Sequence, residues 1–411
     1  MSGAQARPAG SARSTSEPPA PLAGLRVVEF THMVMGPAAG AVLTGLGAEV
    51  VRVEPPGGDH TRRLIGSGAG YHPMYNRHKA SVALDLKSPK GLDAARRIAA
   101  RSDVLVENFR PGALDRVGLG YDALAAENPR LIYCSLKGFL PGPYEHRTAL
   151  DEVAQMMGGL AYMTGPPGRP LRAGSSVIDV TGGMFGAIAI LAAVEERHRT
   201  GRGQKVQASL FETCVYLVGQ HMAQFAVTGA PAAPMPARVS AWAIYDVFET
   251  LDDPVFVGVV SDALWERFCA LFDLDDLWAD PTLRRNNDRV RQRERLLPRV
   301  RDLFARHTRA ELIAKLEGSG IPFAPIARPD ELFDDPHLTG SGRLEPVAFS
   351  DGRTTSLPAL PIEMDGRGLA APARLPGPGD DMAAVLGGLG FSDAEVAELR
   401  RQAAPAPEGG G

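Results

Sequence analysis

Short apolar runs alternate with helical patterns along the first half of the chain. Leu25–Phe30 (LRVVEF) and Glu49–Val53 (EVVRV) contain β-branched residues in short apolar runs and predict two strands. Between them a small-residue helix is predicted to follow Met35-Gly36-Pro37 and to end near Leu46, before Gly47-Ala48. A strand, a helix and a strand in so short a segment predict a βαβ unit with parallel strands and a right-handed crossover.

The same alternation continues and predicts an open, doubly wound α/β fold. Further strands are predicted at Ser81–Leu84, Asp103–Glu107 and Arg130–Leu136, with a helix at Gly91–Ala100. Ligands of such folds bind beyond the carboxyl ends of the parallel strands. We therefore expect the segments that follow three of these strands to carry the binding site, namely 31–37, 107–112 and 137–142.

Two long helical patterns follow. The first, Met184–Arg199, is apolar on most sides at its start, which is typical of a helix buried in a large core or at a subunit interface. The second runs from about Leu210 to Val227. The longest apolar stretch, Met184–Val194, is shorter than the roughly 20 residues that span a bilayer. The sequence therefore predicts no membrane-spanning helix.

A change of composition at Gly229–Pro236 (GAPAAPMP) indicates a linker. Beyond it, Ala243–Glu249 and Val255–Val260 predict a hairpin, and helical patterns continue to Gly318, so we expect a second, smaller α+β domain. The predicted division has five parts: a disordered lead (1–22), the N-terminal part of the large domain (23–228), the small domain with its linker (229–327), a return linker with the C-terminal part of the large domain (328–402), and a disordered tail (403–411).

Composition excludes several classes of protein. The 411 residues include 44 Lys plus Arg and 48 Asp plus Glu, a formal charge of −4, which argues against a protein that neutralises nucleic-acid phosphates. Cys134, Cys214 and Cys269 lie far apart in apolar runs. They therefore predict neither a disulfide framework nor a metal site, but three buried thiols in a reducing cytoplasm.

Two glycine-rich segments resemble phosphate-binding loops without their context. Gly66–Gly70 (GSGAG) does not lie between a strand and a helix, and Gly201–Lys205 (GRGQK) lacks the P-loop pattern. We interpret the first as a mobile loop and the second as the end of a helix. A nucleotide-hydrolysing or dinucleotide-dependent enzyme is therefore not predicted.

Asp179 is the strongest candidate for a nucleophile. It follows the apolar segment from Ser175, and Thr181-Gly182-Gly183 is expected to open the long helix. A carboxylate near the positive end of a helix stays ionised, and two glycines beside it leave room for a bulky substrate. The alternative is a helix N-cap, which is the more common role of Asp at such a position.

Two post-strand loops could bind anions. Asn108–Gly112 (NFRPG) ends a strand and opens a helix, whose free N–H groups suit an anion or a thioester oxygen. Lys137, followed by Gly138 and Phe139, could hold a phosphate or a carboxylate. The alternatives are a solvated loop in the first case and an exposed loop lysine in the second.

Seven motifs in one order carry a resemblance that spans about Leu25 to Leu399. They are Met35-Gly36-Pro37, Leu46-Gly47-Ala48-Glu49-Val50, Val53-Glu54-Pro55-Pro56, Asn76-Arg77-His78-Lys79, Leu84-Asp85-Leu86-Lys87, Val106-Glu107-Asn108-Phe109-Arg110-Pro111-Gly112 and Thr200-Gly201-Arg202-Gly203-Gln204. On these residues the chain resembles the family III CoA-transferases, also called the CaiB/BaiF family. The resemblance implies a Rossmann-like large domain that contains both chain ends, a small inserted domain, and a homodimer of two interlocked subunits.

The resemblance also implies a chemistry. The family's nucleophile is an Asp before a glycine-containing helix start, and Asp179 occupies that place. Its carboxylate would attack a donor acyl-CoA, possibly succinyl-CoA by family habit, and pass through an aspartyl anhydride and an aspartyl-CoA thioester. A small carboxylic acid would then accept the CoA. Coenzyme A is thus expected as a co-substrate, with no permanently bound cofactor, no metal, and neither nucleic acid nor membrane as partner.

The family's CoA contacts carry over by motif position to nine residues. They are His32, Arg77, Lys79, Asn108, Phe109, Arg116, Lys137, Gly138 and Phe139. The cations would meet the CoA phosphates, and the two Phe rings would pack on apolar parts of the molecule.

The chain departs from the family's formyl-CoA transferases at two places. Val34 stands where those enzymes have a Gln near the acyl group, and 238–243 lacks their glycine-rich loop. Formate and oxalate are therefore not expected as the natural pair. The candidates for binding a second carboxylate of the acceptor are Arg62, Arg63, Arg172 and Arg238.

Two alternatives remain open. The α-methylacyl-CoA racemases of the same fold use the His of a Gly-His-Asp motif as one base, but the matching residues here are Ala149-Leu150-Asp151, and Leu cannot take a proton. His146 is nearby, preceded by Glu145. The second alternative is a non-catalytic CoA-binding protein, against which the presence of Asp179 argues.

Overall fold

The computed structural model describes residues 19–369, 371 and 373–404. The predicted disordered lead and tail lie mostly outside these residues, but their inner boundaries are wrong. The Leu22 N–H donates to the Leu46 carbonyl at 2.9 Å, and Ala403 is buried and accepts a hydrogen bond from Gly57 N–H at 2.9 Å. Folded structure therefore begins before residue 23 and extends past residue 402.

The chain divides into two compact units. The large unit contains the residues up to Ala161, Arg172–Gln220 and the residues from Ser341 onward, and the small unit contains Tyr162–Leu171 and His221–Gly340. The small unit thus extends beyond the predicted 229–327 on both sides and also takes a segment from the predicted large domain. Helices α6 (Leu160–Thr164) and α8 (Leu210–Thr228) cross the division.

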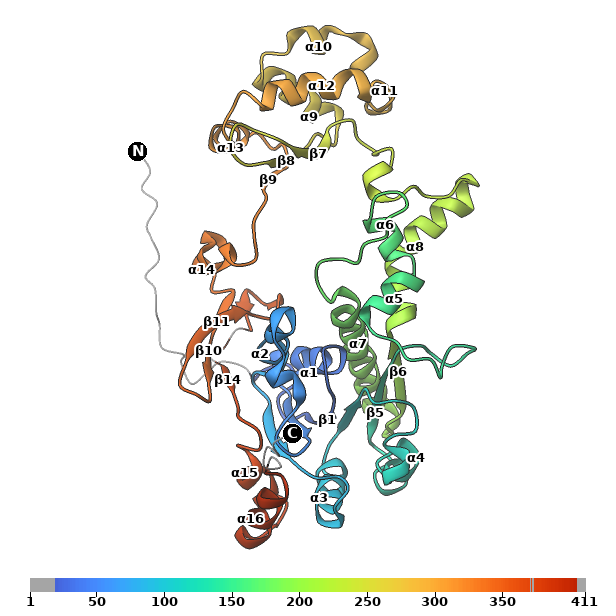
Figure 1. Cartoon of the computed structure of the whole chain (residues 1–411), viewed down its shortest axis with the longest axis vertical. Helices are drawn as coiled ribbons and strands as arrows, with labels where there is room; N and C mark the ends of the chain where they lie inside the picture. The colour runs from blue at the N-terminus through green and yellow to red at the C-terminus, as the bar shows by residue number, and fades with distance from the viewer. Residues whose placement is uncertain (1–18, 370, 372, 405–411) are drawn as a thin grey trace, which may run out of the picture. The chain divides into compact units, whose positions relative to one another are not determined.

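A six-stranded parallel sheet forms the centre of the large unit (Figure 1). Its order is β3-β2-β1-β4-β5-β6, and Phe30 lies opposite Glu107 where β1 and β4 pair. The order reverses between β1 and β4, which places a ligand crevice at the carboxyl ends of these two strands. The strands are β1 (Arg26–Phe30), β2 (Glu49–Glu54), β3 (Ala80–Ala83), β4 (Val104–Glu107), β5 (Ile132–Lys137) and β6 (Lys205–Ser209).

The predicted α/β fold class is confirmed, and five of the six strands match predicted ones. The sixth, β6, was missed because GRGQK was interpreted only as the end of a helix. Gly66–Gly70, predicted as a mobile loop, forms the short 3₁₀ helix η2.

Apolar side chains from β1 point to both faces of the sheet, as the period of a strand requires. Val28 joins a cluster with α3 (Pro89–Ala100), α4 (Tyr121–Glu127), α15 (Met382–Gly387) and α16 (Asp393–Gln402). Val27 joins a second cluster with α1 (Met35–Gly45), α5 (Asp151–Met157), α7 (Val177–Thr200) and the start of α8. Both faces are therefore covered, as in a doubly wound sheet.

Helix α7 begins seven residues before the predicted start, so that Asp179 lies inside it rather than before it. Gly182 and Gly183 face α1: a Cβ added to them would lie 2.8 Å from the Met35 Cε and 2.6 Å from the Met35 carbonyl oxygen, respectively. These glycines allow two helices to approach closely, which corrects the expectation that they make room for substrate.

By length and composition alone, α7 could cross a membrane, although the sequence predicted no such helix. A core helix of a soluble protein meets the same test, and α7 packs against α1, β5 and β6. The feature is therefore weak evidence for a membrane.

Two smaller sheets also belong to the large unit. A three-stranded sheet contains β10 (Leu344–Phe349), β11 (Thr354–Pro358) and β14 (Ala373–Leu375), and a two-stranded pair contains β12 (Glu363–Met364) and β13 (Arg367–Gly368). A further helix, α2 (Tyr71–Asn76), follows η1 (His60–Arg63) and η2.

The small unit is an antiparallel sheet with helices. The predicted hairpin is confirmed as β7 (Tyr245–Phe248) and β8 (Val255–Gly258), and β9 (Phe323–Pro325) pairs with β8. Trp265, Phe268 and Phe304 are fully buried in its core. Its helices are α9 (Asp262–Leu271), α10 (Asp275–Ala279), α11 (Asn286–Arg291), α12 (Arg293–Phe304), α13 (Arg309–Leu316) and α14 (Pro336–Gly340).

Candidate active site

The loops after β1 and β4 are joined where the order of the sheet reverses. The Asn108 side chain accepts the His32 N–H at 2.9 Å and donates to the His32 carbonyl, also at 2.9 Å. The His32 ring packs against Phe109, with 5.3 Å between ring centroids. His32, Asn108 and Phe109 were predicted to share one site, and the pairing of β1 with β4 brings them together.

A cavity of about 200 Å³ opens beside these loops and contains five of the predicted site residues. Asp179 lines it together with His32, Asn108, Lys137 and Gly138. Four separate segments of the large unit supply these residues, so no local sequence pattern could have grouped them. The other lining residues are Met33, Met35, Tyr71, Leu136, Ala149, Leu150, Asp151, Glu152, Ser176 and Leu210.

Asp179 is the third residue of α7 and does not cap it. The N-cap position belongs to Ser176, whose side chain makes no capping hydrogen bond. Instead, the carboxylate of Asp151 accepts the N–H groups of Ile178 at 2.9 Å and Asp179 at 3.1 Å. The N-cap alternative for Asp179 is therefore wrong, and Asp179 lines the cavity.

The pKa of Asp179 is raised to about 7, first because the carboxyl is buried and then because Asp151 and Glu152 bring negative charge near it. The positive charge of Arg172 opposes this shift only in part. This corrects the expectation that the helix end keeps Asp179 fully ionised, since another carboxylate already occupies that end. A carboxylate with such a pKa is a stronger nucleophile than an ordinary Asp and is still half ionised near neutral pH.

Arg172, a candidate for binding the acceptor's second carboxylate, is engaged within the large unit. Its guanidinium lies 3.3 Å from the Asp151 carboxylate and 2.5 Å from that of Glu152. It also donates to the Ser175 carbonyl at 3.0 Å. Its contacts indicate a residue that fixes the segment before α7.

Lys137 and Phe139 have different surroundings although they are two residues apart. The Lys137 ammonium lies 2.6 Å from the Glu107 carboxylate and donates to the Phe109 carbonyl at 2.9 Å, at the edge of the cavity. Phe139 is 3% exposed and packs against Phe211, with 5.4 Å between ring centroids. Phe139 is thus a core residue, which gives no support to its predicted contact with CoA.

Lys79 and Arg77, two predicted cofactor contacts, are buried cations with internal partners. The Lys79 ammonium lies 2.8 Å from the Glu29 carboxylate and donates to the Pro37 carbonyl at 2.9 Å. Arg77 contacts the Glu345 carboxylate and the carbonyls of Met74 and Pro358. These internal partners give no support to either predicted phosphate contact, because a buried cation that is already paired would have to leave its partner uncompensated.

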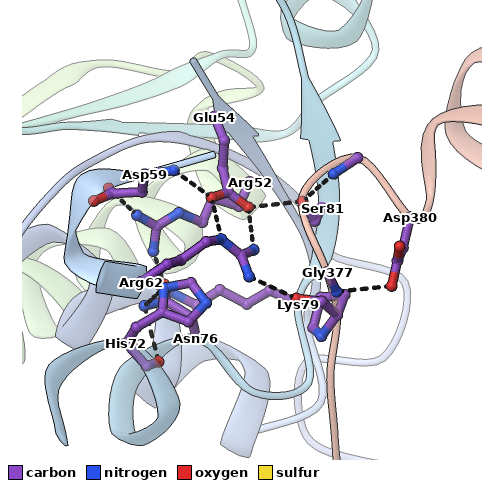
Figure 2. Close-up of polar contacts among 12 residues, drawn as sticks. Arg52, Glu54, Asp59, Arg62, His72, Asn76, Lys79, Ser81, Gly377 and Asp380 are labelled. Atoms are coloured by element: carbon purple, nitrogen blue, oxygen red, sulfur yellow. Dashed lines mark hydrogen bonds and ion pairs between the residues drawn. The ribbon is translucent and has the colours of Figure 1, made fainter. Parts of the chain in front are cut away.

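Lys79 belongs to a larger buried network, whose members other than Glu29 are labelled in Figure 2. Arg52 contacts Asn76 and Asp59 and donates to the Thr31 carbonyl at 3.3 Å, next to His32. Arg62, another candidate for an acceptor carboxylate, lies 2.5 Å from Glu54. Burial alone would raise the pKa of Glu54, but Arg62 and Arg52 outweigh it and lower that pKa to about 2. We call Glu29, Arg52, Glu54, Asp59, Arg62, Asn76 and Lys79 the buried ionic network.

A second cavity, of about 690 Å³, lies on the other side of His32. Phe109 lines it, as do His60 and Lys87. Lys87 belongs to one of the motifs that carry the family resemblance, but it was not predicted to contact CoA. Arg116, which was predicted, is exposed on η3 (Asp115–Val117) and lines neither cavity.

Known proteins match the chain along most of its length. The model of the CoA-transferase family III matches residues 22–382. The succinyl-CoA:glutarate CoA-transferase of Mus musculus is 34% identical over 78% of this chain and 76% of its own, and the acetyl-CoA:oxalate CoA-transferase of Acetobacter aceti is 32% identical over 85% and 91%. A crystal structure of a CAIB/BAIF family protein from Brucella suis superposes with a TM-score of 0.80 at 31% identity, covering 90% of this chain and all of that one.

These matches and the geometry lead to one assignment. The family match covers both units, and structural neighbours of the same family share the fold. CoA serves such enzymes as a co-substrate that passes from an acyl-CoA to an acid. The chain belongs to family III of the CoA-transferases, the CaiB/BaiF family, and is an enzyme of that transferase class.

Proposed function

We propose that Asp179 is the covalent nucleophile that carries CoA from a donor acyl-CoA to a small carboxylic acid. The observation that supports this most is the position of Asp179, which lines a cavity with His32, Asn108 and Lys137 and has a raised pKa. A nucleophilic carboxylate needs access to substrate and incomplete stabilisation of its own charge, and Asp179 has both.

The proposed reaction has four balanced steps. An Asp179 oxygen attacks the thioester carbonyl of the donor, the C–S bond breaks, and CoA thiolate leaves a mixed anhydride. The thiolate attacks the Asp179 carbonyl of that anhydride, which releases the donor acid and forms an aspartyl-CoA thioester. The acceptor carboxylate attacks this thioester and expels the thiolate again. The thiolate finally attacks the acceptor's acyl carbon, which yields the new acyl-CoA and free Asp179.

The large unit offers groups that suit these steps. The Lys137 ammonium at the cavity edge would stabilise negative charge on a departing carboxylate or thiolate. The second cavity is large enough for a sizeable part of CoA, and His32 borders both cavities. We propose that CoA lies along Phe109, with Lys87 and His60 available to its phosphates.

The relatives suggest the substrates. Two of them are named for succinate and glutarate: the mouse enzyme and the succinate–glutarate CoA-transferase of Agrobacterium fabrum, which is 30% identical over 94% of this chain. We propose succinyl-CoA as donor and a small dicarboxylic acid as acceptor. Of the four arginines considered for the second carboxylate, Arg62 and Arg172 are bound to Glu54, Asp151 and Glu152, and Arg238 belongs to the small unit, so Arg63 remains the candidate within the large unit.

We also propose a homodimer. Several large apolar side chains on the large unit are exposed, among them Met184 and Ile188 on α7 and Tyr216 on α8, which is 73% exposed. Large apolar side chains that are exposed in number are typical of an interface. Sedimentation equilibrium should give twice the mass of the chain, and a monomer at micromolar concentration would contradict this part of the proposal.

One observation argues against the racemase. Leu150, which takes the place of the racemase His in the matching motif, lines the same cavity as Asp179. A hydrocarbon side chain cannot exchange a proton with the carbon beside the thioester. In deuterated buffer, the enzyme with donor acyl-CoA alone should introduce no deuterium at that carbon.

The decisive test follows the covalent intermediate. The wild-type enzyme is incubated with succinyl-CoA and treated with borohydride or hydroxylamine, and its peptides are analysed by mass spectrometry. A modification on Asp179 that is absent from Asp179→Ala is the expected result. A wild-type enzyme that exchanges CoA without this modification would contradict the mechanism. An enzyme that binds CoA but exchanges it with no acid, across a panel of mono- and dicarboxylates, would support the non-catalytic alternative.

A further inference from the structure

A carboxylate from another helix caps the start of α7. Asp151 is the first residue of α5 and is 3% exposed. One of its oxygens accepts both the Ile178 N–H at 2.9 Å and the Asp179 N–H at 3.1 Å. The first turn of a helix has four N–H groups without partners in the helix. Asp151 therefore satisfies two of them, including that of the proposed nucleophile.

Other residues hold this cap in place. The Gln155 amide donates to the second Asp151 oxygen at 2.5 Å, and its own oxygen accepts the Ala173 N–H at 2.8 Å. Arg172 donates to the same Asp151 oxygen at 3.3 Å and to the Ser175 carbonyl at 3.0 Å. The first turns of α5 and α7 and the segment between them thus form one connected, partly buried cluster.

We propose that Asp151 is a positioning residue for the Asp179 nucleophile: by accepting the N–H groups of Ile178 and Asp179, it fixes the first turn of α7 with the Asp179 carboxylate in the cavity. The inference rests on the proposed function of Asp179. Nothing in the sequence marked Asp151 for this role, since it lies 28 residues before Asp179.

The cap also limits the hydrogen bonds that the Asp179 carboxylate can accept. A carboxylate in the first turn of a helix readily accepts a hydrogen bond from the free N–H groups there, which lowers its pKa and its nucleophilicity. Asp151 occupies two of these donors, so the Asp179 oxygens remain available to an acyl carbon. The charged or titratable groups that act on Asp179 are Asp151 and Glu152 of α5, Arg172 and, on α2, Tyr75.

The test compares Asp151→Ala with Asp151→Asn. Ala removes both the hydrogen-bond acceptor and the charge, whereas Asn keeps an oxygen that can accept the two N–H groups. We expect Asp151→Ala to lower kcat and the single-turnover rate of Asp179 modification by about thirtyfold or more, with KM for succinyl-CoA changed less than about threefold. Asp151→Asn should keep kcat within about fivefold of the wild type and move the acid limb of the pH–rate profile to lower pH.

Asp381 provides a matched control in the large unit. Its carboxylate accepts the Ser81 N–H at 2.8 Å, a similar contact from a side chain to a distant backbone, and it lines neither cavity. Asp381→Ala should lower the melting temperature without lowering kcat. If Asp151→Ala changed only the melting temperature in the same way, its role would be structural and the inference would be wrong.

The remaining outcomes are also decisive. Asp151→Ala with a wild-type rate of Asp179 modification, or with a loss confined to KM, would overturn the inference while the proposed function stands. If Asp151→Ala does not fold, Asp151→Asn becomes the test. An acid limb of the pH–rate profile at the wild-type pH would overturn the inference, and so would a kcat lowered more than about thirtyfold. A wild-type enzyme with no modification on Asp179 would overturn the proposed function, and the inference with it.

Discussion

Two charge clusters of the large unit, the buried ionic network and the partly buried groups around Asp179, differ in their balance of charge. In the buried ionic network, three cations (Arg52, Arg62 and Lys79) each contact one of three carboxylates (Asp59, Glu54 and Glu29). Around Asp179, three carboxylates share the single guanidinium of Arg172, which contacts only two of them.

This difference in the balance of positive and negative charge distinguishes a cluster that stabilises the fold from one that favours a reactive carboxylate. A buried charge with a direct partner is stabilised, and the pKa of Glu54 accordingly falls to about 2. A buried carboxylate beside like charges is destabilised, and the pKa of Asp179 rises to about 7. The first cluster connects β1 and β2 to Lys79, the residue before β3. The second cluster, under the proposed function, keeps a nucleophile ready to react with an acyl group.

The largest expected effect is the loss of catalysis in Asp179→Ala. Removing a covalent nucleophile should lower the rate of CoA transfer by at least about 10⁴-fold, because every later step requires the aspartyl intermediate. Binding of CoA, measured by calorimetry, should change little. Residual exchange within tenfold of the wild type would place the reactive group outside this cluster.

Lys79→Met should have the opposite effects to Asp179→Ala: a large loss of stability and little change in catalysis. It leaves Glu29 buried without its cation, so we expect the free energy of unfolding to fall by about 3–5 kcal/mol. The double variant Glu29→Gln/Lys79→Met should recover part of this loss, and kcat/KM of the folded fraction should stay within about threefold of the wild type. Urea denaturation measures the first effect; a large loss of CoA affinity in folded Lys79→Met would restore the predicted phosphate contact.

Gly40→Ala tests how tightly α1 packs over the buried ionic network. A Cβ at Gly40 would lie 2.1 Å from a Glu29 oxygen and 2.8 Å from the Lys79 ammonium. We expect a loss of about 2–3 kcal/mol in the free energy of unfolding, by overpacking. Gly387→Ala on α15, where a Cβ would meet nothing within 4 Å, is the control and should be neutral or slightly stabilising. Equal stability of the two variants would mean that α1 is not closely packed against the Glu29–Lys79 ion pair.

The pH dependence of the reaction tests the same comparison between Asp179 and Glu54. The proposed mechanism requires the ionised form of Asp179, so kcat/KM for succinyl-CoA should be constant above pH 8 and fall about tenfold per pH unit below about 7. Glu54, with its pKa near 2, stays ionised over this range and should add nothing to the profile. An acid limb near pH 4 would show that Asp179 titrates as an ordinary carboxyl.

Much of the fold follows from local patterns. The strands β1 to β5 are short runs of β-branched and apolar residues between turn signals, and their alternation with helices determines the parallel arrangement. The edge strand β6 was missed, because Lys205 and Gln207 are exposed and interrupt the apolar run. The start of α7 was predicted too late, because its cap comes from Asp151, far away in the sequence.

The site was predictable only in part, for a related reason. His32, Asn108, Lys137 and Asp179 follow strands or open a helix, and the topology alone brings them to one cavity. Lys79 belongs to a family motif yet faces the interior of the protein, because Gly40 leaves room for its ion pair with Glu29. A motif gives the identity of a residue, whereas its partners across the fold decide whether it meets a substrate.

The most direct test of the central claim is peptide mass spectrometry of the wild-type enzyme after reaction with succinyl-CoA and reduction by borohydride. We predict that the side chain of Asp179 is converted to the corresponding alcohol, and that no other carboxylate in the chain changes. An enzyme that turns over at full rate while Asp179 remains an unmodified carboxylate throughout would contradict the account.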